Sequence, residues 1–240
     1  MPRARRLASL AAVAILGLTG LVACRSAPDV AVYLGDQRVT NDRVDQIVDA
    51  AELPAAQRPQ AAESPAAAGA QPTVSRQQVV DLLVSLDLAK RIAKDQNISV
   101  DNEVTPAQVA SELQIAPGSE YATAFADWIN TAQAIMTKAD ASTKPTDQQI
   151  LAVYNGLVKA RAIDPGLPLD QVKQAFGDGR FVAAAAALSD QLSAQATASH
   201  VTVNPRYLPL AAPMFVTANG RPVFYQLPYV AGSGAVTDQA

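Results

Sequence analysis

Apolar residues along the chain recur mostly at intervals of three and four, the spacing of helices, and only two short stretches have the character of strands. The first is VAVYLGDQRV, residues 30–39, in which Gly35 supplies the positive φ of a tight turn between two strands. The second is Val201 to Val203. The pattern predicts a mainly α protein: a helical bundle with a small β-component formed by an N-terminal hairpin and a C-terminal strand.

Two helix starts carry a capping signal. Ser75 is followed by Gln78, and this pair has the form of a capping box, in which each side chain accepts a hydrogen bond from the other residue's backbone amide. The pattern recurs as Thr105 and Gln108, with Pro106 at the first helical position, where its missing N–H costs nothing. Further helices are expected from Thr40 or Asn41 to before Pro54, over 119–136, from 145 to a break at 164–166, over 168–176 and over 180–199.

Two segments lack this periodicity. Residues 54–73 are rich in Pro and Ala and poor in large apolar residues, so they cannot bury enough surface to offset the entropy of ordering, and we expect a flexible, exposed insert. After Tyr207 the chain is punctuated by prolines, and an extended tail is expected over 208–240. The folded domain is therefore expected over 29–207.

Residues 1–23 are interpreted as an export signal that is not part of the domain. Arginines at positions 3, 5 and 6 precede an uncharged, mainly apolar run from Leu7 to Ala23. This run is shorter than the roughly 20 apolar residues that span a bilayer, and it contains Gly17 and Gly20. A signal peptide is the better interpretation.

The run ends in Leu21, Val22, Ala23 and Cys24, and it resembles the bacterial lipobox. The alternative role of a lone cysteine is that of a small buried apolar residue. The resemblance implies cleavage before Cys24 and a diacylglycerol on its sulfur, with 24–28 as a lipidated tether. Two acyl chains anchor a protein stably in a bilayer, whereas a protein with a single chain dissociates readily. We therefore expect an extracytoplasmic protein that is lipid-anchored at the outer face of the cytoplasmic membrane.

Composition excludes several classes of function. A net charge of −3, from 19 Lys and Arg against 22 Asp and Glu, provides no basic stripe for nucleic-acid binding. One Cys and one His exclude multi-cysteine metal sites and sites with two imidazoles. His200, the sole imidazole, is expected to meet the last carbonyls of a helix. No nucleotide, zinc or serine-hydrolase motif occurs, so we expect neither an enzyme nor a cofactor beyond the covalent diacylglycerol.

The stretch from Asp95 to Glu103 alternates oxygen-bearing side chains in the manner of a calcium loop. However, its sixth position is Val100 where the turn needs Gly, and its twelfth is Pro106 where a bidentate Glu belongs. We interpret the stretch as a polar connection and expect no metal.

The order of elements resembles a known family. The chain is similar to the N-terminal chaperone domain of SurA-like and PrsA-like extracytoplasmic folding factors. The likeness rests on four segments in order: VAVYLGDQRVTNDRVDQIV, a long helix that ends at NISVDNEVTPAQVASEL, then PTDQQILAVYNGL, and a last helix that leads into VTVNPRY. The likeness covers roughly residues 29–207 apart from the insert. It implies a SurA N-terminal-domain-like fold in which helices form a cradle for unfolded polypeptide.

Many relatives carry a parvulin-type prolyl isomerase domain before the last helix, but only Lys159 to Arg180 lies there in this chain, which is too short. The resemblance therefore implies a chaperone without catalysis, whose partners are unfolded or exported polypeptides and the lipid bilayer. The alternative is an envelope scaffold lipoprotein that binds one specific folded partner.

An aromatic stripe on the expected helix 119–136 comprises Tyr121, Phe125 and Trp128. Such a stripe commonly belongs to a core. Under the family resemblance, these side chains are instead the candidates for lining a peptide-binding crevice.

Overall fold

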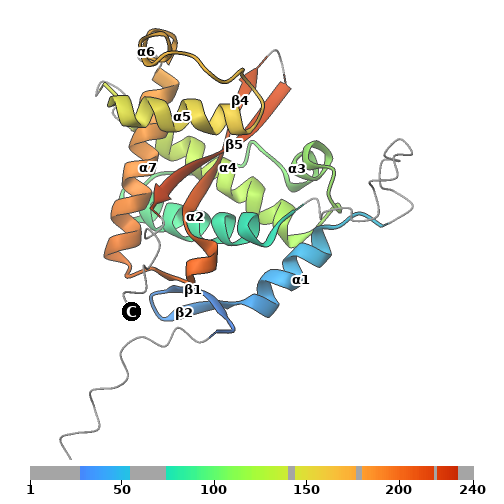
Figure 1. Cartoon of the computed structure of the whole chain (residues 1–240). Helices are drawn as coiled ribbons and strands as arrows, with labels where there is room; N and C mark the ends of the chain where they lie inside the picture. Colours follow the sequence, from blue (N-terminus) through green and yellow to red (C-terminus); the bar gives the residue numbers. More distant parts are fainter. Residues whose placement is uncertain (1–27, 55–73, 140–143, 177–179, 219–220, 232–240) are drawn as a thin grey trace, which may run out of the picture.

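The computed structural model describes residues 28–54, 74–139, 144–176, 180–218 and 221–231, and the statements below concern these residues. They form a mainly α structure with two small antiparallel sheets, which confirms the expected fold class at that level (Figure 1). The helices are α1 (Asn41–Ala51), α2 (Arg76–Asp95), α3 (Pro106–Leu113), α4 (Glu120–Lys138), α5 (Asp147–Lys159), α6 (Leu169–Phe176) and α7 (Arg180–Ala198).

Several helices begin at side-chain caps, at positions that the sequence predicts. Ser75 and Gln78 form a complete capping box at the start of α2, with the Ser75 amide 2.8 Å from Oε1 of Gln78. Boxes of the same kind open α3, from Thr105 with Gln108, and α5, from Thr146 with Gln149. Each box satisfies amides that the first helical turn leaves without a partner.

Four helices end on a residue that is not glycine but adopts the left-handed conformation. These residues are Asn97, Gln114, Arg161 and His200, with φ between 51° and 58°. At the end of α7 the amide of His200 bonds to the carbonyl of Thr197, and the amide of Val201 bonds to that of Ala196. This pair of bonds is the Schellman motif, so His200 meets the last carbonyls through its backbone.

The first sheet joins the N-terminal hairpin to the strand that follows α7, as expected. Its order is β2 (Gln37–Thr40), β1 (Val30–Leu34) and β3 (Thr202–Val203), and both pairings are antiparallel. The central strand is almost completely buried, whereas β2 is largely exposed. Beyond β3, the amide of Asn204 bonds to the carbonyl of Ala31 at 2.9 Å.

The second sheet corrects the expected domain boundary. Residues after Tyr207 do not form an extended tail throughout, because β4 (Leu210–Ala218) and β5 (Arg221–Val230) pair as an antiparallel hairpin. β4 packs on α2, and β5 packs on α5 and α7. Their inward side chains belong to the same buried core as the helices, so the folded unit continues to Val230.

Prolines enter this hairpin only where they remove no ladder bond. Pro213, Pro222 and Pro228 occupy pairs of the same parity in the register. At these pairs the backbone points away from the partner strand, since the carbonyl of Pro213 accepts from Trp128 and that of Pro228 from Ser189. The missing N–H groups therefore cost the hairpin nothing.

A glycine lets α5 lie close to the hairpin. A Cβ built on Gly156 would stand 2.8 Å from Cδ2 of Tyr225 and 2.9 Å from the carbonyl oxygen of Gln226. Both distances are shorter than van der Waals contact, so the helix and strand approach more closely than any other residue type permits.

The helices α2 and α4 contact each other at the centre of the fold, and α1, α3, α7 and β4 pack around this pair. Figure 1 shows α6 at one end of the molecule and the three-stranded sheet at the other. The largest completely buried side chains are contributed by both sheets and most helices, which makes one continuous core; they include Trp128, Ile47, Leu82, Leu88, Ile115, Ile135, Leu188, Leu192 and Leu210.

Several expectations fall outside the described residues: the signal peptide 1–23 with its lipobox and Cys24, the insert 54–73 beyond Pro54, and the end of the chain after Ala231. Across the described ranges, none of the helices has the length and apolar character needed to cross a bilayer.

Candidate functional site

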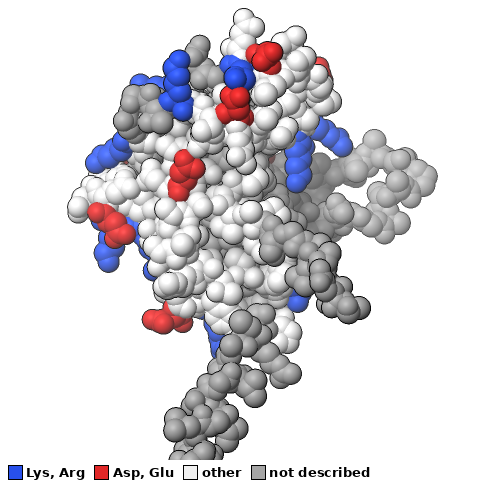
Figure 2. Space-filling model, turned by 60° about the vertical axis from the view of Figure 1, so that its left-hand side comes forward, with Lys and Arg blue, Asp and Glu red and all other residues white. Residues whose placement is uncertain are grey.

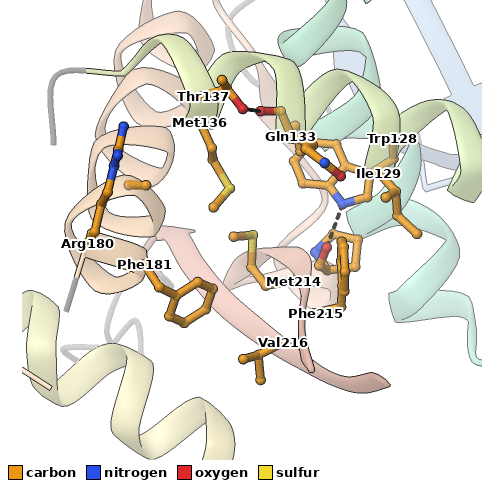
Figure 3. Close-up of a pocket in the computed structure, with 13 residues that line it drawn as sticks. Trp128, Ile129, Gln133, Met136, Thr137, Arg180, Phe181, Met214, Phe215 and Val216 are labelled. Carbon is orange, nitrogen blue, oxygen red and sulfur yellow. Dashed lines mark hydrogen bonds between the residues drawn. The ribbon is translucent and has the colours of Figure 1, made fainter. Parts of the chain in front are cut away.

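A largely apolar groove of about 620 Å³ lies between α4, α7 and β4 (Figure 3). Figure 3 shows Met136, Phe181 and Met214 converging on it from these three elements, with Arg180 at one end and Trp128 at the other. Its lining residues are Trp128, Ile129, Ala132, Gln133, Met136, Thr137, Arg180, Phe181, Ala184, Pro213, Met214, Phe215 and Val216.

Helical periodicity explains the contribution of α4. The pairs 128–129, 132–133 and 136–137 follow one another at intervals of four, so they lie along one face of the helix. Opposite them, α7 presents Phe181 and the small Ala184, whose methyl group leaves the groove open. Met136 and Phe181 are half-buried, so their apolar surface is partly accessible to a ligand.

The contribution of β4 is a strand edge, not one face of a strand. Four consecutive residues, Pro213 to Val216, line the groove, although side chains alternate between the two faces of a sheet. At this edge the indole N–H of Trp128 donates a hydrogen bond to the carbonyl of Pro213 (Figure 3). This bond attaches α4 to β4 at the point where β4 begins to line the groove.

The polar groups of the groove are few. Arg180 is its only charged lining residue, and it is exposed. Thr137 directs its hydroxyl to the carbonyl of Gln133 within α4, at 2.8 Å. More widely, charged side chains of both signs are scattered over the face of the molecule seen in Figure 2.

The structure separates the three residues of the predicted aromatic stripe. Trp128 lines the groove, but only through a side chain that is itself almost fully buried. Tyr121 and Phe125 lie in the core, with ring centroids 5.8 Å apart, and burial raises the pKa of the Tyr121 hydroxyl. Phe125 also packs edge-on against Phe224 of β5 at 5.6 Å, so these rings hold the hairpin to α4.

Most of the groove is not predicted from the sequence, above all Arg180, Phe181, Met214, Phe215 and Val216. A signal for the β4 part was present in the sequence, since an Asn-Gly dipeptide at 219–220 between apolar runs is typical of a tight hairpin. No comparable local signal marks Arg180 or Phe181, because their role depends on an element that lies thirty residues further along.

One buried carboxyl group lies away from the groove. Asp81 of α2 is 3% exposed and accepts hydrogen bonds from the amide of Ala211, at 3.1 Å, and from Nε2 of Gln77, at 3.0 Å. Burial raises the pKa of Asp81 from 3.8 to about 7, although these hydrogen bonds and the charge of Lys159 act in the opposite direction. Gln77 also donates to the carbonyl of Tyr207, so the pair holds the start of β4 on α2.

Within the described part of the chain, no group of three or more His, Cys, Asp or Glu side chains is placed to hold a metal ion. Comparison with protein families, with curated proteins and with solved structures finds no match for this chain.

Proposed function

We propose that this chain is a lipid-anchored extracytoplasmic chaperone that binds unfolded or exported polypeptides without catalysis. The observation that carries the proposal is the groove between α4, α7 and β4, which is apolar and bordered by one charged side chain. A groove of this kind gains free energy by covering apolar side chains, with few directional contacts, and therefore accepts many sequences.

The side chains of the groove suit a variable client. Met136 and Met214 face each other across it, and methionine is unbranched and polarisable, so it adapts to ligands of different shape. Phe181 and Phe215 add rigid apolar surface. This mixture is typical of surfaces that bind several partners.

The resemblance to SurA-like folding factors supports the same function. It rests on the order of the elements, and the pairing of β1 with β3 is compatible with the expectation that the N-terminal strand meets the strand near residue 202. A diacylglycerol on Cys24 would hold the groove close to the membrane, where exported chains emerge.

The test uses the soluble chain that starts after Cys24, added to a chemically unfolded model protein whose aggregation is followed by light scattering. We expect suppression at stoichiometric excess and no activity in a parallel prolyl-isomerase assay. Met136→Asp places a charge in the groove and should reduce suppression, whereas Thr123→Asp, on an exposed position near the other end of α4, should not.

Two results would contradict the proposal. Absence of suppression by the folded protein is one, and equal suppression by the two aspartate variants is the other. A defined, saturable complex with one folded protein, without affinity for unfolded chains, would favour a scaffold lipoprotein instead.

A further inference from the structure

The outer edge of β4, on the side away from β5, lines the groove and carries backbone hydrogen-bonding groups. In an antiparallel pair, successive residues turn their N–H and C=O alternately toward and away from the partner strand. Ala211 and Pro213 are of the outward kind, since the amide of Ala211 bonds to Asp81 and the carbonyl of Pro213 accepts from Trp128. The next outward residues are Phe215 and Thr217.

Phe215 lies at the open position of this edge. It pairs with Phe224 in the register and, by the alternation, turns its N–H and C=O away from β5. Across the described ranges, no other residue bonds to either group. Because Trp128 occupies the carbonyl of Pro213 and a proline has no N–H, free pairing positions begin at Phe215.

The outer edge of β5 is less suited to pairing. Two of its outward positions are Pro222 and Pro228, which have no N–H to donate, and the carbonyl of Pro228 accepts from Ser189. Proline on an edge strand is a common device against unwanted pairing. Proline thus interrupts the outer edge of β5 at two positions, whereas the edge of β4 is free at Phe215 beside an apolar groove.

We infer that an extended polypeptide segment binds by adding a strand along β4, with its backbone paired to the N–H and C=O of Phe215 and its apolar side chains in the groove. This inference rests on the proposed function and names how the client is held. Main-chain bonds supply affinity for any sequence, and alternate side chains of the client contact Met136, Phe181 and Met214.

The charge of the groove adds a preference. Arg180 is the only charged lining residue and has no ion pair or hydrogen bond within the described structure. An acidic residue or terminal carboxylate beside the apolar part of the client can form an ion pair with Arg180. Because Arg180 is exposed, this preference amounts to about two- to fivefold in affinity.

The test is binding of a fluorescein-labelled peptide of alternating valine and serine with one terminal aspartate, followed by anisotropy with the unaltered protein. Two further peptides carry N-methyl groups on alternate residues, one set on the valines and the other on the serines. A client strand turns only one of these sets toward β4, so one methylated peptide should bind about tenfold more weakly and the other as before. Equal affinities of the two methylated peptides, or no binding of the parent peptide, would overturn the inference.

Protein variants give a second, independent reading. Phe215→Pro removes the outward N–H, as Pro213 does naturally at the same parity, whereas Phe215→Ala removes the ring and keeps the N–H. With both variants shown to be folded by thermal melting, weaker binding of the peptide by the proline variant than by the alanine variant supports strand addition. Equal binding by both contradicts it.

The two proposals fail separately. Suppose that suppression of aggregation depends on Met136 but the two methylated peptides bind with equal affinity. This result would support the proposed chaperone function and overturn strand addition. If one methylated peptide binds more weakly than the other but aggregation is not suppressed, strand addition is supported and the chaperone function is contradicted. Arg180→Gln should abolish the preference for the aspartate peptide over a lysine counterpart while preserving binding of both.

Discussion

The two sheets of this protein differ in what their strands do. In the first sheet, the buried strand β1 is paired on both sides, and its neighbour β2 carries exposed polar residues such as Gln37 and Arg38. In the second, neither strand has a second neighbour among the described residues, yet both are packed among helices. The first sheet therefore joins segments that are distant in the sequence. The second sheet completes the core, and the outer edge of β4 lines the groove.

A strand with a free edge therefore need not lie at the surface of a fold. Leu210, Ala212 and Met214 of β4 are buried, as are Tyr225 and Leu227 of β5. Burial of these side chains fixes the hairpin without use of its outer backbone groups. A strand held in this way can offer its edge to a ligand without being displaced.

Removal of the hairpin is the most severe test of this comparison. A chain that ends at Tyr207 keeps the first sheet but exposes the surfaces of α2, α5 and α7 that contact β4 and β5. We expect it to lose cooperative thermal unfolding, as measured by circular dichroism. A chain that ends at Ala231 keeps every described contact and should unfold as the full chain does; normal unfolding of the shorter chain would show that the hairpin is an appendage.

The buried carboxyl group of Asp81 tests how the hairpin is attached. Its folded pKa of about 7 lies above the unfolded value of 3.8, so the folded state binds the proton more tightly, and this contribution to stability is lost as the pH rises from about 4 to about 7. Asp81→Asn keeps an oxygen for the amide of Ala211 and carries no charge. It should therefore raise the free energy of unfolding at pH 8, on the order of a few kcal/mol, and leave it unchanged at pH 4.

The measurement is denaturant unfolding of the two proteins at both pH values. Asp87→Asn is the control, since this partly exposed carboxylate on the same helix pairs with Arg91 at 2.7 Å. It should not produce a pH-dependent gain. An Asp81→Asn variant that is less stable at pH 8 would show that the charge itself holds β4.

The close approach of α5 to the hairpin predicts a smaller loss. Gly156→Ala forces a methyl group against Tyr225 and the backbone of Gln226, and overpacking of this kind costs about 1–3 kcal/mol. Asn155→Ala, at the exposed neighbouring position, should change stability little. Amide exchange would locate the effect, with faster exchange in β5 and unchanged protection in β1.

The smallest expected effect is a gain near the first sheet. His200 adopts φ 51° between α7 and β3, a conformation that costs side-chain-bearing residues free energy and that glycine adopts readily. His200→Gly should raise the free energy of unfolding by about 0.5–1 kcal/mol in thermal or denaturant melts. His200→Ala keeps the strain and serves as the control; equal stability of both variants would contradict the explanation.

Local signals in the sequence predicted most of the helical part. A capping pair such as Ser75 with Gln78 works within four residues, so its effect is readable without knowledge of the fold. The strand at Val203 was also predicted, although only the structure shows its pairing with Val32. These elements form because each is favoured by its own residues.

The hairpin and the groove could not be found in this way. The prolines at 213, 222 and 228 argue against strands unless the register is known, since the same residue is harmless at an outward position and disruptive at an inward one. The groove arises only when α4, α7 and β4 meet. The predicted aromatic stripe lies on the correct helix, but the neighbours of α4 decide which of its faces stays accessible: they leave Met136 half-buried and cover Phe125 almost completely.

The pairing of β1 with β3 also sets the order of events during synthesis. Asn204 bonds to the carbonyl of Val30 across a separation of 174 residues. The strand that is made first must therefore wait for nearly the whole chain before it finds its second neighbour, and contacts so distant in sequence form slowly. Until then β1 lacks its second neighbour, and a free strand edge of this kind is open to pairing with other chains.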